Sequence, residues 1–191
     1  LMMVYGGPDS QTVTDGWGLG WEQFLAQEGF LVASVDGRGT GARGEAFRKG
    51  AYGRLGADEV EDQAAAALHF AEIGLADAER IGVFGWSYGG FMACGCILRR
   101  PDVFHAAIAV APVTHYRYYD SVYTERYMGL PSGNVRGYRD NAPLSYARNL
   151  KGRLLLVHGL NDDNVHAKNS LDLVEELIKE GKDFETHFVP N

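Results

Sequence analysis

Cysteine is scarce in this sequence, which has only Cys94 and Cys96 among its 191 residues. A scaffold held together by disulfides is therefore excluded, and the redox compartment stays open. The two residues lie two positions apart on a predicted helix, so their side chains point in different directions and are not expected to pair. We expect both to be small core residues of that helix.

Long apolar runs are also missing. None approaches the roughly 20 residues that a membrane-spanning helix requires, and no signal peptide is visible. The sequence starts inside an apolar run, at Leu1, without an initiator methionine. We therefore expect it to be a piece of a longer polypeptide, truncated at both ends, and the compartment is unknown from the residues themselves.

Positive charge is in deficit. Eighteen Lys and Arg residues against 25 Asp and Glu give a net charge of −7, with a pI near 5.3. Without a basic face to neutralise phosphates, a nucleic-acid partner is not expected. Internal repeats and low-complexity tracts are absent as well. What remains is the composition of one soluble globular domain, 46% hydrophobic and 23% charged, that can bury a sizeable core.

Predicted strands and helices alternate along the chain. The expected strands are residues 1–5, 30–35, 81–84, 106–111, 154–158 and 184–189, and the expected helices are residues 17–27, 58–73, 91–99 and 165–179. This alternation predicts the α/β class, with a mostly parallel sheet and helices on both faces. In such sheets the chemistry gathers at the carboxyl ends of the strands. Five residues with that placement are Tyr5, Asp36, Ser87, Pro112 and Asp162.

The segment Gly85-Trp86-Ser87-Tyr88-Gly89-Gly90 has the Gly-x-Ser-x-Gly pattern between a predicted strand and a predicted helix. In that context the pattern indicates a nucleophile elbow, where a sharp turn lifts the serine hydroxyl above the sheet edge. Small residues are needed on either side of such a turn. We therefore predict an α/β-hydrolase with Ser87 as nucleophile and the backbone N–H of Tyr88 in the oxyanion hole. A glycine-rich turn with an ordinary surface serine is the alternative.

A serine nucleophile needs a histidine base oriented by a carboxylate, and in this fold the chain order is Ser, acid, His. The acid should follow a later strand, where Asp162 and Asp163 stand side by side. We favour Asp162, because Asp163 can cap the helix expected from Val165. None of the six histidines stands after the last strand, so we expect the base just beyond Asn191.

Two further patterns are weaker. Residues 39–44 fit G-x-G-x-x-G, but no clean helix opens from them, so we do not expect a dinucleotide cofactor. His158, Asp162, Asp163 and His166 could be read as metal ligands, yet no supporting Cys pair or His-x-x-x-His helix accompanies them. No metal or other cofactor is therefore expected.

A long tyrosine-rich segment, residues 112–150, follows the strand expected at 106–111. Connections of this length inside a compact domain are usually functional. Tyrosine combines an apolar body with a polar tip, which suits both a substrate pocket and a packed surface excursion. Spacing alone leaves these two alternatives open.

Together these motifs resemble the prolyl oligopeptidase family of serine peptidases, and most closely its dipeptidyl peptidase IV branch. The resemblance covers nearly the whole chain. It is carried by the elbow and by the blocks Tyr5-Gly6-Gly7-Pro8, Val35-Asp36-Gly37-Arg38-Gly39, Glu59-Val60-Glu61-Asp62-Gln63, Ala111-Pro112-Val113, Tyr118 to Gly129 and Asp162-Asp163-Asn164-Val165-His166. The Tyr118–Gly129 block is specific to that branch, whereas Gly-x-Ser-x-Gly is shared by many hydrolases.

The resemblance implies a role for each matching residue. Ser87 and Asp162 would be catalytic, and Tyr5 would donate its phenol to the oxyanion beside the N–H of Tyr88. The pocket for a proline-like ring would be lined by Tyr88, Val113, Tyr116, Tyr119, Tyr123 and Val165, and Asn164 would hold a substrate carbonyl. The family more often has Trp at the position of Tyr116. The missing histidine would fall about three residues past Asn191, and the family's β-propeller is absent.

The resemblance therefore implies part of the catalytic domain of an exopeptidase that releases N-terminal dipeptides after a penultimate proline or alanine, through an acyl-enzyme. It also implies a homodimeric parent protein that is periplasmic, secreted or at the cell surface. Two alternatives stay open: an acyl hydrolase of the same fold, such as an acylaminoacyl peptidase or esterase, and a non-catalytic binding domain. The preferred residue before the scissile bond is not predicted.

Overall fold

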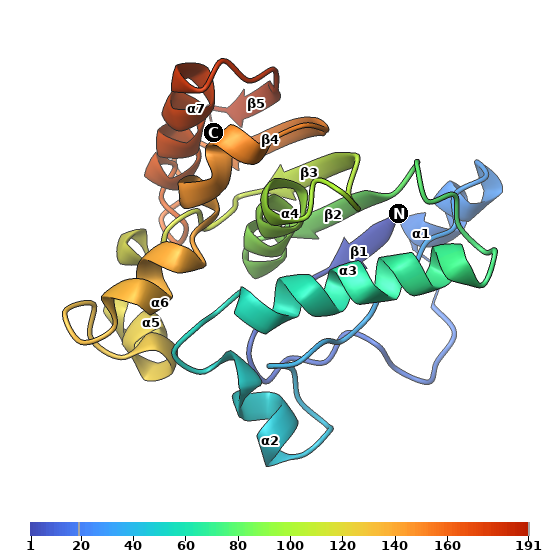
Figure 1. Cartoon of the computed structure of the whole chain (residues 1–191), viewed down its shortest axis with the longest axis horizontal. Helices are drawn as coiled ribbons and strands as arrows, with labels where there is room; N and C mark the ends of the chain where they lie inside the picture. Colours follow the sequence, from blue (N-terminus) through green and yellow to red (C-terminus); the bar gives the residue numbers. More distant parts are fainter. Residues whose placement is uncertain (19, 191) are drawn as a thin grey trace.

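The computed structural model describes residues 1–18 and 20–190 and contains a five-stranded parallel sheet (Figure 1). The strands are β1 (Met2–Val4), β2 (Gly82–Trp86), β3 (Ala106–Val110), β4 (Arg153–Gly159) and β5 (Glu185–Val189). They lie in the order β1-β2-β3-β4-β5, and each pair is in parallel register. The predicted α/β class with a parallel sheet is confirmed.

The helices cover the two faces of the sheet unequally. The longer ones are α1 (Trp21–Gln27), α3 (Ala57–Glu72), α4 (Tyr88–Arg99) and α7 (Lys168–Lys179). Successive strands from β2 to β5 are added in one direction, so right-handed crossovers place their connecting helices on the same face. Helix α4 packs on β2 and β3 from that face, and α3 packs against α4 (Figure 1). Helix α1 lies on the other face, where Trp21 contacts the Phe84 ring.

The winding direction of the chain reverses at β1. After β1 the chain first passes the outer side of that strand, where Ala33 bridges Met2, and only then enters β2 on the inner side. The loops that leave β1 and β2 therefore diverge from neighbouring strand ends. In open α/β sheets such a switch point is where ligands bind, and here Tyr5 and Ser87 follow the two strands.

The strand expected at residues 30–35 does not form, and that prediction was wrong. The segment makes one isolated bridge to β1, through hydrogen bonds between the Ala33 backbone and the Leu1 and Met3 backbones. Phe30 and Leu31 are exposed. The apolar residues favoured a buried strand, but the segment lies at the sheet edge, with β1 as its neighbour on one side.

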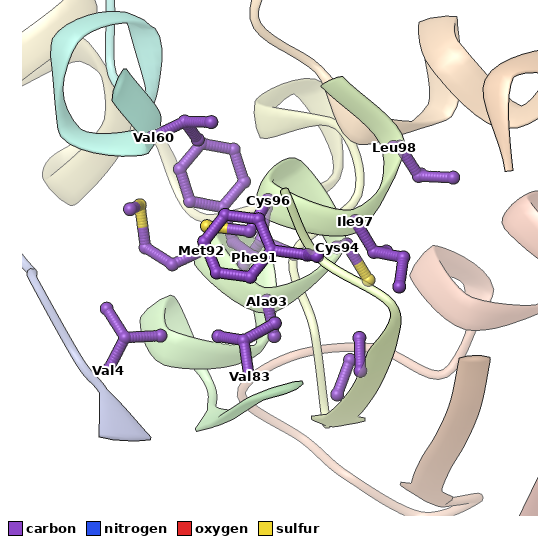
Figure 2. Packing of buried hydrophobic residues seen from close by; sticks show 14 of the residues in the cluster. Val4, Val60, Val83, Phe91, Met92, Ala93, Cys94, Cys96, Ile97 and Leu98 are labelled. Atoms are coloured by element: carbon purple, nitrogen blue, oxygen red, sulfur yellow. The ribbon is translucent and has the colours of Figure 1, made fainter. Parts of the chain in front are cut away.

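The core is concentrated around α4, in which eleven consecutive residues from Tyr88 to Leu98 are buried. Figure 2 shows Phe91, Met92 and Cys96 of this helix between Val60 of α3 and the strand residues Val4 and Val83. Cys94 and Cys96 are both free and fully buried, which confirms them as core residues. A tightly packed support of this kind resists small displacements, so it holds the start of α4 in place.

The tyrosine-rich segment between β3 and β4 folds into four short helices. They are η2 (Tyr116–Tyr118), α5 (Ser121–Met128), α6 (Val135–Asp140) and η3 (Pro143–Asn149). Its start is tied to α7, because the Thr114 N–H and hydroxyl bond to the side chain and carbonyl of Asn169. Its middle is tied to the loop that follows the short helices α2 (Glu45–Arg48) and η1 (Lys49–Ala51), because the Asn134 side chain donates to the Gly53 carbonyl. The segment is therefore anchored at two places.

Within residues 1–18 and 20–190, no helix has both the length and the hydrophobicity of a membrane span.

Candidate active site

Ser87 stands in the turn between β2 and α4 with a backbone that non-glycine residues seldom adopt. Its φ of 59° and ψ of −114° lie in a sparsely populated region of backbone conformation, which is strained for a residue with a side chain. The turn is held from both sides, because the Ser87 N–H donates to the Val110 carbonyl at 2.9 Å and the Ser87 carbonyl accepts from the Phe91 N–H at 3.0 Å. Tyr88 is the first residue of α4, where backbone N–H groups lack an intrahelical partner. This is the strand–turn–helix geometry that the sequence pattern predicts.

The flanking glycines are required by close backbone contacts. A Cβ added at Gly85 would overlap the Gly89 carbonyl, and one at Gly89 would overlap the Val4 carbonyl at the end of β1. A Cβ at Gly90 would press on the Val110 carbonyl and on Pro112. The elbow is therefore wedged directly between the ends of β1 and β3.

A small pocket of about 40 Å³ opens beside Ser87. Its lining consists of Tyr5, Ser87, Tyr88, Val113, Tyr116, Tyr119 and Tyr123. Every one of these residues was named from the sequence, and they come from three separate parts of the chain. The tyrosine-rich segment supplies three of the rings, so the segment does lie beside the predicted nucleophile.

The rings around the pocket contact one another in two series, one centred on Tyr88 and one that joins Tyr119 and Tyr123. Tyr88 lies 6.1 Å from Tyr5, 5.2 Å from Phe91 and 6.4 Å from Tyr116, measured between ring centroids. Tyr123 lies 5.3 Å from Tyr119. Tilted and edge-to-face arrangements at these separations are favourable for aromatic pairs. The result is a slot walled by packed aromatic rings, with phenol oxygens among the groups that line it.

Burial strongly affects the phenols of this slot. Desolvation raises the pKa of Tyr88 and of Tyr116 well above the ordinary value, and it also raises the pKa of Tyr123. All three are therefore neutral at physiological pH. The Tyr116 hydroxyl is buried and has no hydrogen-bond partner among the described residues. Tyr5, in contrast, is exposed at the mouth of the pocket.

Asp162 lies in the loop after β4 and organises it. Its Oδ1 accepts from the backbone N–H groups of Asn164 and Val165 at 3.0 and 2.9 Å. Its Oδ2 lies 3.6 Å from Nε2 of the buried His158. Asp163 is exposed, and it does not cap the following helix, because α7 begins at Lys168 with Ala167 as N-cap. The predicted capping role of Asp163, and the helix start near Val165, were wrong.

The loop of Asp162 is joined to the pocket. The Tyr119 phenol donates to Asn164 Oδ1 at 3.0 Å. The next residue, Val165, is buried. The Val165 carbonyl in turn lies 2.7 Å from Nε2 of His158. The residues expected to form the acid, the carbonyl-binding group and the pocket wall are thus held in one hydrogen-bonded arrangement.

The remaining motifs have structural roles. Residues 39–44 form a loop fixed to residues 9–10 by the bonds from Asp9 N–H to the Gly39 carbonyl and from Gly41 N–H to the Ser10 carbonyl. Asp36 accepts from the Thr12 and Val13 backbones. Among residues 1–18 and 20–190 there is no group of three or more His, Cys, Asp or Glu side chains that could hold a metal ion.

One residue of this region was missed by the sequence analysis. Glu59 is buried in the first turn of α3, and its Oε1 accepts from the Tyr88 phenol at 2.9 Å. The sequence analysis named Glu59 only within a block that carries the family resemblance and assigned it no role. The available signal was position, because Glu59 lies on the same helix face as Gln63, in register with the buried alanines.

The chain matches known proteins along almost its whole length. A model of the prolyl oligopeptidase family matches residues 17–191. Dipeptidyl peptidase 4 of Sus scrofa is 46% identical over 190 residues, which cover 97% of this chain and 25% of that protein. Prolyl endopeptidase FAP of Mus musculus is 42% identical over 191 residues, with 97% and 25% covered.

A solved structure agrees with the sequence matches. The crystal structure of Porphyromonas gingivalis dipeptidyl peptidase 4 is similar with a TM-score of 0.95 and 47% identity, covering 98% of this chain and 27% of that one. The chain spans about a quarter of the length of the relatives it matches. On both sequence and fold, the chain belongs to the prolyl oligopeptidase family.

Proposed function

We propose that the protein is a serine peptidase of the dipeptidyl peptidase IV type, and that residues 1–191 are part of its α/β-hydrolase catalytic domain. The observation that carries this proposal is the strained Ser87 elbow opening onto a small tyrosine-walled pocket. The family membership supports the class of reaction. The proposal includes the β-propeller, the C-terminal tail and the homodimeric assembly that the family resemblance implies.

In the proposed mechanism Ser87 Oγ attacks the carbonyl carbon of the scissile peptide bond and loses its proton to a histidine just beyond Asn191. Asp162 orients that histidine, and Tyr5 and the Tyr88 N–H donate to the oxyanion of the tetrahedral intermediate. The C–N bond then breaks, and the amine leaves with the proton held by the histidine. Water, deprotonated by the same histidine, releases the acyl group and restores Ser87.

The substrate proposed is a peptide with proline or alanine as its second residue. A pyrrolidine ring is flat, apolar and small, which suits a slot walled by Tyr88, Tyr116 and Tyr123. Asn164, whose Oδ1 accepts from the Tyr119 phenol, is proposed to donate its amide N–H to a substrate carbonyl. Larger side chains would meet the buried rings, which the packing around α4 keeps from moving apart.

The test compares two reporters on the full-length protein: a Gly-Pro chromogenic amide and an acetyl-amino-acid amide. Cleavage of the Gly-Pro reporter with little action on the acetylated one is expected. The opposite preference would favour an acylaminoacyl peptidase and would overturn the pocket assignment, although Ser87 would still be the nucleophile. Hydrolysis of neither would favour a non-catalytic domain.

A further inference from the structure

Glu59 carries a carboxyl group in a place where a carboxyl group is costly. The residue is 2% exposed, and among the described residues its Oε2 has no hydrogen-bond partner. A buried, unsatisfied oxygen costs about 1–3 kcal/mol of stability. Asp58, the preceding residue, is half-buried and pairs with Arg38 and Arg54. The backbone N–H groups of Gly56 and Glu59 at the start of α3 also act on the Glu59 carboxyl, but that role at the helix terminus does not by itself require contact with α4.

Among residues 1–18 and 20–190, the side chain that forms a hydrogen bond to Glu59 is that of Tyr88, which lines the pocket. The Tyr88 phenol donates to Glu59 Oε1 at 2.9 Å, across the interface between α4 and α3. The backbone end of Tyr88 is fixed by the elbow, so this bond fixes the opposite end of the side chain. Burial raises the pKa of Glu59, against the opposing effect of nearby backbone N–H groups and the phenol. Whether or not it carries the proton, the carboxyl keeps an acceptor oxygen for the phenol.

The Tyr88 ring is the central member of its series of ring contacts. It is in ring contact with Tyr5 on one side and with Phe91 and Tyr116 on the other. A shift of this ring would therefore change the width of the slot and the neighbours of the proposed oxyanion donor together. Packing constrains a ring, but a buried hydrogen bond at its tip also defines how deep it sits.

We propose that Glu59 is a positioning residue that holds the Tyr88 ring in place and thereby sets the selectivity for proline over alanine before the scissile bond. The inference rests on the proposed function, because it assigns the Tyr88 wall to that residue of the substrate. Proline fills the slot and touches the ring, whereas alanine reaches it less. Displacing the ring should consequently weaken the binding of proline substrates more than the binding of alanine substrates.

The first experiment measures kcat and KM of the full-length protein on Gly-Pro and Gly-Ala amide reporters. Glu59→Leu removes the acceptor at similar volume, and Glu59→Gln keeps an acceptor oxygen. We expect Glu59→Leu to lower the ratio of kcat/KM for proline over alanine roughly ten-fold, mainly through KM for the proline reporter. Glu59→Gln should keep the ratio within about three-fold of wild type. Glu72→Leu, at the exposed end of the same helix, is the matched control and should leave both reporters unchanged.

The second experiment is a double-mutant cycle. Tyr88→Phe deletes the phenol oxygen and keeps the ring, so it should lower the selectivity ratio in the same direction. If Glu59 acts through the phenol, Glu59→Leu should add little further loss in the Tyr88→Phe background. Should Glu59→Leu fail to fold, Glu59→Gln and Tyr88→Phe still carry the test, with unfolding temperatures recorded for every variant.

Different results would overturn different statements. If the wild-type protein cleaves the Gly-Pro reporter, but Glu59→Leu or Tyr88→Phe slows both reporters equally, the positioning role is wrong and the proposed function stands. Additive losses in the cycle would also overturn the positioning role. If the wild-type protein cleaves neither reporter, the proposed function fails, and this inference fails with it.

Discussion

Replacing Gly89 by alanine should damage both the fold and the nucleophile. The added Cβ would overlap the Val4 carbonyl and would stand 3.3 Å from the Tyr5 Cα. Both neighbours are backbone at the end of β1, which cannot rotate away as a side chain can. Overpacking of this kind typically costs about 1–3 kcal/mol. For a domain of this size each kcal/mol lowers the unfolding temperature by roughly 2–4 °C.

The same substitution should also reduce reactivity, because relief of the clash requires β1 and the elbow to move apart. Tyr5 would then be displaced relative to Ser87, and a displacement of about 1 Å near reacting groups can cost roughly 100-fold in rate. The assay is the rate of covalent labelling by a fluorophosphonate probe, together with thermal unfolding of the full-length protein.

Gly133→Ala is the matched control for Gly89→Ala. A Cβ at Gly133 would meet only the Leu130 carbonyl, at an ordinary contact distance of 3.6 Å, and the residue does not have a positive φ. It should change stability by less than about 0.5 kcal/mol. If Gly89→Ala matched Gly133→Ala in both unfolding and labelling, the argument that the elbow is wedged against β1 would be refuted.

Three further predictions follow from the described contacts. Ser87→Ala in the full-length protein should abolish acylation and leave the unfolding temperature unchanged within error; surviving turnover would falsify Ser87 as nucleophile. Asp162→Asn keeps an oxygen for the two loop N–H groups that Asp162 binds, so it should lower kcat by about 10⁴-fold with little loss of stability, whereas Asp163→Asn should be near neutral in the same assays. Burial raises the pKa of Cys94 to about 12 and raises that of Cys96 further, so mass spectrometry should find neither alkylated by iodoacetamide at pH 8 until the protein is unfolded; rapid labelling of the native protein would contradict their burial.

The sequence predicted the parts of the fold that depend on local pattern. The elbow could be identified because a glycine two residues before and after Ser87 is a steric requirement, and the structure shows which carbonyls impose it. The parallel sheet followed from the alternation of strands and helices. The aromatic pocket required the family resemblance, since the spacing of tyrosines alone did not say which face of the molecule they occupy.

Other features depend on contacts between distant segments and could not be predicted locally. Residues 30–35 have the composition of a buried strand, yet they lie at an edge where only an isolated bridge forms. From the sequence, Asp162 was favoured as the triad acid because Asp163 could cap the following helix. In the structure it is the Asp162 carboxylate that accepts hydrogen bonds from the loop backbone. The contact of Glu59 depends on the packing of α3 against α4, because its partner Tyr88 lies 29 residues later in the chain.

The most direct test of the central claim is to trap the nucleophile with a Gly-Pro analogue. The analogue has a diphenyl phosphonate in place of the scissile carbonyl, and the full-length protein is digested with trypsin after the reaction. We expect one phosphonyl adduct on the peptide of residues 81–99, at Ser87, and slower labelling by the corresponding phenylalanine analogue. Labelling at another residue, or faster labelling by the phenylalanine analogue, would contradict it.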